Sequence, residues 1–351
     1  MAYATIDSPK KYFEAKTYTG NGSSQTISGL QFSPDFVWVK LRSGIEWHVL
    51  NDSIRGTTKN LYSNSTSAEI TESLISSLNS DGFTVQNDLK VNSSGSTYVG
   101  WCWDANGSGS SNTSGTITST VSANTTSGFS VVTRTGTGSV GTVGHGLSAV
   151  PSMIITKKRS AVDNWGVYHK SLGATKYLCL NLTDASNTSS SPFNNTEPTS
   201  SVFTVGTGST WNASSATFVD YCFAEVKGFS KAFSYTGNGS TDGTYIHLGF
   251  RPAWVLLKRT DSAGYDWLTY DNKRQVEYNV IDDFLKPNLS DAETTGNANQ
   301  SLDFLSNGIK FRGLGASSNA SGGTYIYMAF AENPFVTSKG LPVTARWFGL
   351  Y

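Results

Sequence analysis

Short apolar runs separated by polar, glycine-rich segments make up most of the chain. Three of these runs are continuous rather than alternating, over residues 36–40, 153–157 and 254–258. A strand with one face in water alternates apolar and polar residues, whereas a continuous β-branched and aromatic run is typical of a strand buried on both faces. We therefore predict a central sheet strand at each run. Residues 68–78 and 278–285 are predicted to be short helices.

The same motifs occur three times in the same order along the chain. Each copy opens with a glycine-rich turn, reaches a proline before the apolar run, and has a lysine at the end of that run. A tryptophan follows seven to nine residues after each lysine, and a polar turn leads into a closing aromatic strand. The opening turns begin at Tyr18, Arg134 and Tyr235, and the closing blocks cover residues 92–103, 212–223 and 319–330. This pattern predicts three tandem repeats of one domain.

Each repeat is long enough to bury a core, and its short strands and tight turns predict an all-β fold of jelly-roll-like β-sandwiches with few short helices. Residues 106–127 are rich in Gly, Ser and Thr and form either a linker or an edge strand, because residues 116–121 alternate. The predicted order is an N-terminal arm (1–15), repeat one (16–105), this segment (106–127), repeat two (128–227), repeat three (228–334) and an aromatic C-terminal tail (335–351).

The composition argues against nucleic acid as a partner and against insertion into a membrane. Only 15% of residues are charged, and 26 Lys and Arg residues balance 26 Asp and Glu residues, so no basic stripe is available for nucleic acid. No apolar stretch reaches the length of a membrane-spanning helix, and the first residues lack the pattern of a signal peptide. We therefore expect synthesis in a cytoplasm without membrane insertion. The three cysteines are predicted to be free and buried.

No catalytic, cofactor or metal site is predicted. The G-x-G-x-x-G match at residues 136–141 aligns with the turn motif of the other repeats and has no strand–turn–helix context for a dinucleotide. The doublet Asp282 and Asp283 does not imply two facing carboxylates, as a glycosidase needs. The chain is therefore predicted not to be an enzyme, with a polysaccharide depolymerase as a less favoured alternative. The four histidines, none with metal-ligand spacing, are His48, His145, His169 and His247.

Two acid–base pairs recur between the first and third repeats. Asp52 is followed three residues later by Arg55, and Asp271 is followed in the same way by Arg274. The second repeat has Lys170 nearby and no corresponding aspartate. A function that needed three identical sites would keep the aspartate in all three repeats, so we predict that the pairs are structural salt bridges.

Four motifs of the first repeat carry a resemblance to a known family: residues 18–23, 32–40, 52–56 and 79–83. Together they resemble a repeated β-rich domain of unknown function found in virion structural and tail-fibre-like proteins of marine tailed bacteriophages. The resemblance covers nearly the whole chain. It implies a place in the virion after assembly in the bacterial cytoplasm, and a concanavalin-like jelly roll. It supplies no catalytic residues.

Two virion roles follow from this resemblance. A tail-fibre, receptor-binding or adhesion component would present aromatic side chains to a host cell-surface glycan. A capsid or tail decoration protein, which cements its neighbours, would instead use its termini to bind other virion proteins. A homo-oligomer is expected in either role, with a trimer favoured. The candidate glycan contacts are Trp47, Trp165, Trp211 and Trp267, and the candidate assembly contacts are Tyr12, Phe13, Trp347, Phe348 and Tyr351.

Overall fold

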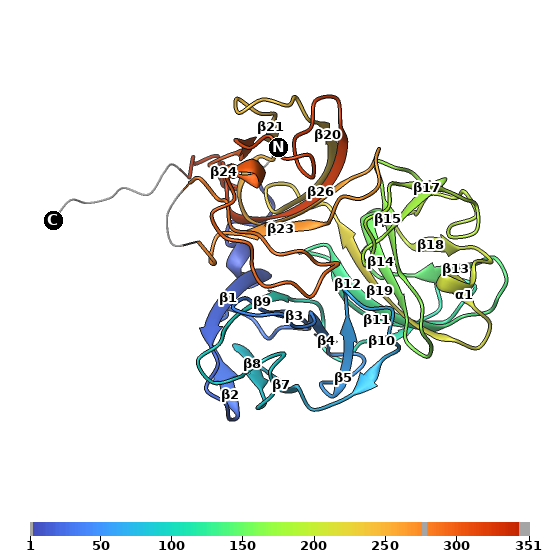
Figure 1. The fold of residues 1–351 in the computed structure, drawn as a ribbon. Coiled ribbons are helices and arrows are strands. Elements are labelled where there is room, and N and C mark those ends of the chain that lie inside the picture. The colour runs from blue at the N-terminus through green and yellow to red at the C-terminus, as the bar shows by residue number, and fades with distance from the viewer. Residues whose placement is uncertain (1–2, 276–278, 344–351) are drawn as a thin grey trace.

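The computed structural model describes residues 3–275 and 279–343 and confirms the all-β fold (Figure 1). The two predicted helices are wrong. Residues 68–78 hold the strand β6 (Ile70–Thr71) and most of β7 (Ile75–Asn79), and residues 279–285 contain only isolated strand bridges. Ser, Thr and β-branched Ile dominate residues 70–77, and these residue types disfavour a helix. The helical turns within the described ranges are η1 (Pro9–Lys11), α1 (Ser209–Asn212) and η2 (Ala298–Gln300).

The first part of the chain, here called unit one, contains two antiparallel sheets. The larger has the order β1-β9-β3-β4-β5-β6, and the smaller has the order β2-β8-β7. Apolar residues of the two sheets pack against each other in one cluster, which includes Val37 from the larger sheet and Phe83 from the smaller. The remaining strands are β1 (Phe13–Thr19), β2 (Gln25–Ile27), β3 (Phe36–Leu41), β4 (Val49–Asp52), β5 (Lys59–Tyr62), β8 (Gly82–Val85) and β9 (Thr97–Trp103).

Unit two follows with an eight-stranded sheet of order β10-β11-β12-β19-β14-β15-β16-β17 and the pair β13-β18. The Gly/Ser/Thr-rich segment 106–127 supplies β10 and β11, so it extends this sheet rather than serving as a linker. The strands are β10 (Ser110–Asn112), β11 (Ser119–Asn124), β12 (Phe129–Thr135), β13 (Gly141–Gly144), β14 (Pro151–Lys158), β15 (Trp165–His169), β16 (Lys176–Cys179), β17 (Asn187–Thr188), β18 (Val202–Val205) and β19 (Thr217–Ala224).

Unit three has a four-stranded sheet of order β20-β26-β22-β23 and a three-stranded sheet of order β21-β25-β24. In all three larger sheets the opening strand pairs with the closing strand, which pairs with the apolar-run strand, which pairs with the strand after it. The strands are β20 (Ser230–Thr236), β21 (Tyr245–His247), β22 (Phe250–Arg259), β23 (Leu268–Asp271), β24 (Leu302–Leu305), β25 (Gly308–Phe311) and β26 (Thr324–Pro334).

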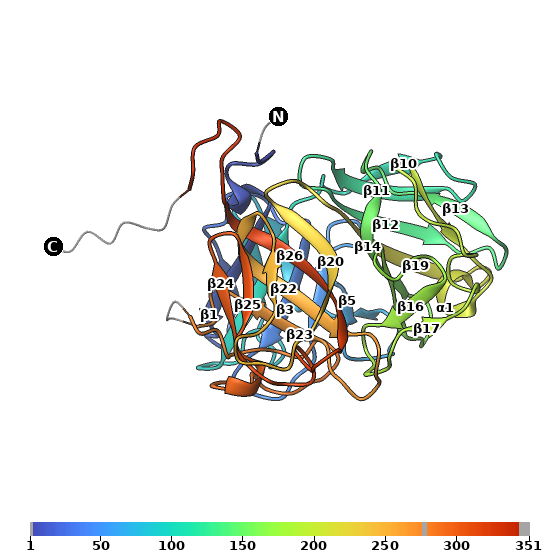
Figure 2. The same ribbon diagram turned by 90° about the horizontal axis from the view of Figure 1, so that it is seen from above.

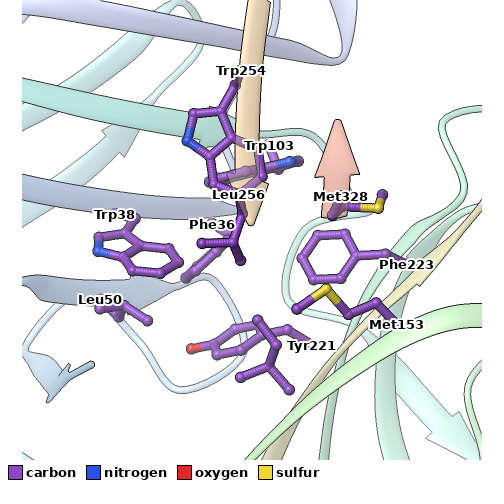
Figure 3. Close-up of a pocket in the computed structure, with 11 residues that line it drawn as sticks. Phe36, Trp38, Leu50, Trp103, Met153, Tyr221, Phe223, Trp254, Leu256 and Met328 are labelled. Carbon is purple, nitrogen blue, oxygen red and sulfur yellow. The ribbon is translucent and has the colours of Figure 1, made fainter. Parts of the chain in front are cut away.

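The three units surround a common centre, with unit one blue to teal, unit two green to yellow and unit three yellow to red (Figures 1 and 2). The faces of the larger sheets that point away from their own smaller sheets pack together there as one central core, which is continuous with the core between the two sheets of unit three. Each apolar-run strand is therefore buried on both faces, as predicted. Phe36, Met153 and Trp254 come from the three runs and line a small cavity at this centre (Figure 3). Its volume of about 10 Å³ is at the lower limit for one water molecule.

Candidate functional site

Equivalent contacts join the three units into a closed ring. The lysine that ends each apolar run is buried, and its ammonium donates to a backbone carbonyl of a neighbouring unit. Unit one binds unit three, unit three binds unit two, and unit two binds unit one. The bonds are Lys40 Nζ to Ser290 O (3.1 Å), Lys258 Nζ to Thr183 O (3.3 Å) and Lys157 Nζ to Thr66 O (2.9 Å). The units therefore form one body with matching internal boundaries.

The residue opposite each lysine on the next strand makes a second contact of the ring. Strand register pairs Lys157 with Trp165, and the same register extended by one residue places Trp267 opposite Lys258 and His48 opposite Lys40. The corresponding bonds are Trp165 Nε1 to Tyr62 O (2.9 Å), Trp267 Nε1 to Cys179 O (3.0 Å) and His48 Nε2 with Lys286 O (3.1 Å). His48, and not Trp47, is thus the counterpart of the two later tryptophans.

This register separates the four tryptophans that were predicted to contact glycan. Trp165 and Trp267 lie at boundaries between units and are at most 1% exposed. Trp211 is buried inside unit two, where its ring packs against Phe193 at 4.8 Å. These three side chains have no surface to offer a ligand in this fold. Trp47 is 37% exposed and remains as a candidate.

The position of Trp47 has a structural role in the other two units. Its counterparts there are Asn164 and Asp266, each of which accepts a hydrogen bond from a nearby asparagine amide. The bonds are Asn181 Nδ2 to Asn164 Oδ1 (2.8 Å) and Asn288 Nδ2 to Asp266 Oδ1 (2.7 Å). An indole has no acceptor, so Trp47 cannot make this bond. Unit one therefore has a partly exposed aromatic ring where units two and three have a polar group that supports the loop.

The buried ring of Tyr62 packs on Trp47, and several carboxylates lie near Tyr62. The ring of Tyr62 lies 4.7 Å from that of Trp47, and the Tyr62 hydroxyl donates to Glu72 Oε2 at 3.3 Å. Burial and the nearby carboxylates of Glu72, Asp88 and Glu46 raise the pKa of Tyr62. We call these five residues the Trp47 surface. It combines a partly exposed aromatic face with carboxylate oxygens that can accept hydrogen bonds.

Lys90, a cation near the Trp47 surface, is already paired. Lys90 Nζ lies 3.3 Å from Asp88 Oδ1 and 3.8 Å from Glu72 Oε2. Acidic groups therefore outnumber basic ones around the aromatic pair. Such a surface can stack on a sugar ring and accept hydrogen bonds from its hydroxyls, and it repels anionic ligands. Within residues 3–275 and 279–343, no group of three or more His, Cys, Asp or Glu side chains could hold a metal ion.

The predicted salt bridge between Asp52 and Arg55 is buried at the boundary of units one and two. Arg55 Nε donates to Asp52 Oδ2 at 2.5 Å, and the Tyr221 hydroxyl of unit two donates to the same oxygen at 2.8 Å. The equivalent bonds between units three and one are Arg274 Nε to Asp271 Oδ2 (2.6 Å) and Trp101 Nε1 to Asp271 Oδ2 (2.8 Å). Burial acts against ionisation, yet Arg274 holds the pKa of Asp271 below its ordinary value.

His169 explains why the second repeat lacks an aspartate. Met153 and Phe36 occupy equivalent positions in their strands. Strand register places Met153 opposite His169 and Phe36 opposite Asp52, so His169 stands where unit one has the aspartate. His169 Nε2 lies 3.1 Å from the carbonyl oxygen of Tyr327 in unit three, so it joins units two and three. A neutral imidazole therefore replaces the charged pair at this boundary. Spacing along the chain could not predict that a histidine replaces the aspartate, because the group that His169 binds lies on unit three.

The candidate assembly contacts that the structure describes pack on their own chain. Phe13 is buried in the central core, where its ring stacks on Phe330 at 5.1 Å. Tyr12 is partly buried, and its ring meets the edge of Phe229 at 6.1 Å. Phe13 therefore has no surface left for another subunit, whereas Tyr12 keeps part of its surface. Trp347, Phe348 and Tyr351 lie outside the described residues.

Fold and site together define an all-β protein of three β-sandwich units around a shared core, with one aromatic surface that departs from the pattern of the units. The chain belongs to the family described as a domain of unknown function (DUF7483), whose model matches residues 8–334 and so spans all three units. None of the curated proteins matches the chain. No helix in the described part of the chain is long and apolar enough to span a membrane.

Proposed function

We propose that this protein is a structural component of the bacteriophage virion surface, of the tail-fibre, receptor-binding or adhesion type, and that it contacts a host glycan through the Trp47 surface. The virion role rests on the motifs that resemble phage tail-fibre-like domains. The glycan contact rests on Trp47, a partly exposed aromatic ring at a position where two equivalent loops carry a polar, loop-supporting side chain. An exposed indole that serves no internal contact of this kind is well suited to stacking on sugar.

The chemistry of the Trp47 surface favours a neutral glycan. Glu46, Glu72 and Asp88 are near enough to act on Tyr62, whereas Lys90 is paired with two of them. Carboxylates accept hydrogen bonds from sugar hydroxyls, and they repel the carboxylate of a uronic or sialic acid. Neutral hexose or hexosamine residues are therefore the proposed ligand class. Higher salt would weaken the repulsion of acidic sugars without much effect on stacking.

The variant that tests the glycan contact is Trp47→Asn, because asparagine is the residue of the equivalent loop in unit two. It removes the aromatic face and supplies the missing acceptor, so the fold should be kept. Val162→Asn is the matched control, since Val162 is an exposed apolar residue of unit two. We expect purified protein and the control to block adsorption of phage to host cells, and Trp47→Asn to lose this effect.

Other outcomes separate the roles. If Trp47→Asn blocks adsorption as well as the unchanged protein, the glycan contact is not at Trp47. If no form blocks adsorption while antibody against the protein labels whole virions, the alternative of a capsid or tail decoration protein is favoured. If the antibody fails to label virions, the virion role is overturned. Release of reducing sugar from host polysaccharide would instead indicate a depolymerase.

A further inference from the structure

A groove lies where both ends of the described chain meet unit three. It has a volume of about 530 Å³, within the range of ligand pockets. Its lining combines the apolar side chains of Tyr3, Phe335 and Val336 with polar or charged side chains that include Glu225, Lys231 and His247. Tyr3 is 61% exposed and Phe335 is 38% exposed, so the groove presents large apolar side chains to water. Such a surface is typical of a site that another segment or molecule covers.

Contacts between the two ends of the chain build the groove walls. The amide of Val343 donates to the carbonyl of Phe335 at 3.0 Å, which turns the chain back toward the groove. The Asp7 carboxylate accepts bonds from the Ser338 amide (2.7 Å) and hydroxyl (2.6 Å). The Thr5 amide donates to the carbonyl of Lys227 at 3.0 Å. The groove is therefore a defined surface, tied down on both sides, rather than a gap between loose ends.

The chain immediately after this groove is unusually apolar. Residues 344–351 include Trp347, Phe348, Leu350 and Tyr351, and their basic residue is Arg346. The segment starts next to Val343, which is bonded to a residue of the groove wall. Eight residues can extend over roughly 26 Å, at about 3.3 Å per residue, so they reach any part of the groove.

We propose that residues 344–351 dock in this groove on their own chain and cover its apolar lining. Attachment at the rim gives the segment an effective concentration in the groove of about millimolar or more. A segment from another copy would lack this advantage and would have to lose translational freedom on binding. Docking would remove from water both the exposed apolar side chains of the groove and those of the segment. This inference is independent of the glycan contact, because the groove and the Trp47 surface share no residue.

Cleavage by an arginine-specific protease tests the docking, since Arg346 lies within the proposed segment. Proteolysis of a docked segment follows the fraction of time that it is undocked. We expect the bond after Arg346 to be cut at least about tenfold faster in the double variant Tyr3→Ser/Phe335→Ser than in the unchanged protein. Val162→Ser, an exposed apolar position of unit two, is the control and should leave the rate unchanged. Mass spectrometry identifies the cleaved bond.

Two results would overturn the proposal. Equal and rapid cleavage after Arg346 in the unchanged protein and in the double variant would show that the groove does not hold the segment. Protection that increases with protein concentration would assign the segment to the groove of another copy. Hydrogen exchange on the unchanged protein gives a second measurement that needs no variant. Slowed exchange of the amides of residues 344–351, independent of concentration, supports docking on the same chain, and unprotected amides contradict it.

Discussion

Arg134 and Asp220 form a charged pair inside unit two, and its removal should cost much of the stability of the protein. Arg134 Nε donates to Asp220 Oδ2 at 2.8 Å, and both side chains are 0% exposed. Thr156 Oγ1 also donates to Asp220 at 2.7 Å, and the Arg134 guanidinium lies 4.5 Å from the ring of Phe218. Removing one partner of such a pair leaves an uncompensated buried charge, which costs about 3–5 kcal/mol.

The equivalent positions of unit one suggest how to remove both charges together, so that neither is left unpaired. Register aligns Arg134 with Tyr18 and Asp220 with Gly100. Unit one therefore has an aromatic ring and no charge where unit two has an ion pair. Each single variant, Arg134→Tyr or Asp220→Gly, is expected to lower the free energy of unfolding by about 3–5 kcal/mol.

The double variant Arg134→Tyr/Asp220→Gly completes the test. It is expected to lose about 3 kcal/mol less than the sum of the two single losses, because neither charge is then left alone. Urea unfolding followed by circular dichroism and tryptophan fluorescence measures all four proteins. Single losses below about 1 kcal/mol, or a double loss equal to the sum, would refute the idea that each charge stabilises the fold mainly by pairing with the other.

Three further outcomes are expected. Burial lowers the pKa of His169 to about 4, so only the unfolded chain takes up a proton as pH falls from about 6.5 to 4. The free energy of unfolding should therefore be highest above pH 6.5 and fall by about 3 kcal/mol on acidification to pH 4. Urea titrations at several pH values measure this loss, which should be smaller in His169→Gln. Tyr221→Phe removes a donor to Asp52 and should destabilise the protein by about 1–3 kcal/mol, measured by thermal unfolding, with an unchanged midpoint arguing against the contact. Burial raises the pKa of Cys222, so a thiol reagent should label it only in urea, and fast labelling of the native protein would contradict its burial.

Local sequence signals predicted the strands and the turns well. The apolar runs became the buried strands, because their side chains have core on both faces. The opening turns are each held by one buried asparagine of the closing block, whose side-chain oxygen accepts from a turn amide. The bonds are Asn21 N to Asn92 Oδ1 (2.9 Å), Thr137 N to Asn212 Oδ1 (3.0 Å) and Asn238 N to Asn319 Oδ1 (3.1 Å). These asparagines are buried parts of the turns, in keeping with the turn chemistry of their sequence.

Contacts between units could not be predicted in the same way. Spacing along the chain aligned Trp47 with Trp165 and Trp267. The loop after the lysine differs in length between units, however, and Trp47 lies one position before the residue that is structurally equivalent to the other two tryptophans. Strand register, which depends on hydrogen bonds between distant segments, was needed to align His48 with Trp165 and Trp267. The burial of these side chains depends on groups from a neighbouring unit, and spacing along one repeat does not report those groups.

Three equivalent units also provide an internal comparison for each position. Some departures are compensated inside the protein: Arg134 has Asp220, and His169 binds a carbonyl of unit three. Trp47 differs, because it gives up the supporting bond that Asn164 makes and places part of an indole in water instead. A departure that loses a supporting bond and leaves an aromatic ring partly in water is better explained by a contact outside the chain. This reasoning selects Trp47 over the three buried tryptophans, and it predicts that Trp47→Asn keeps the fold while it removes binding.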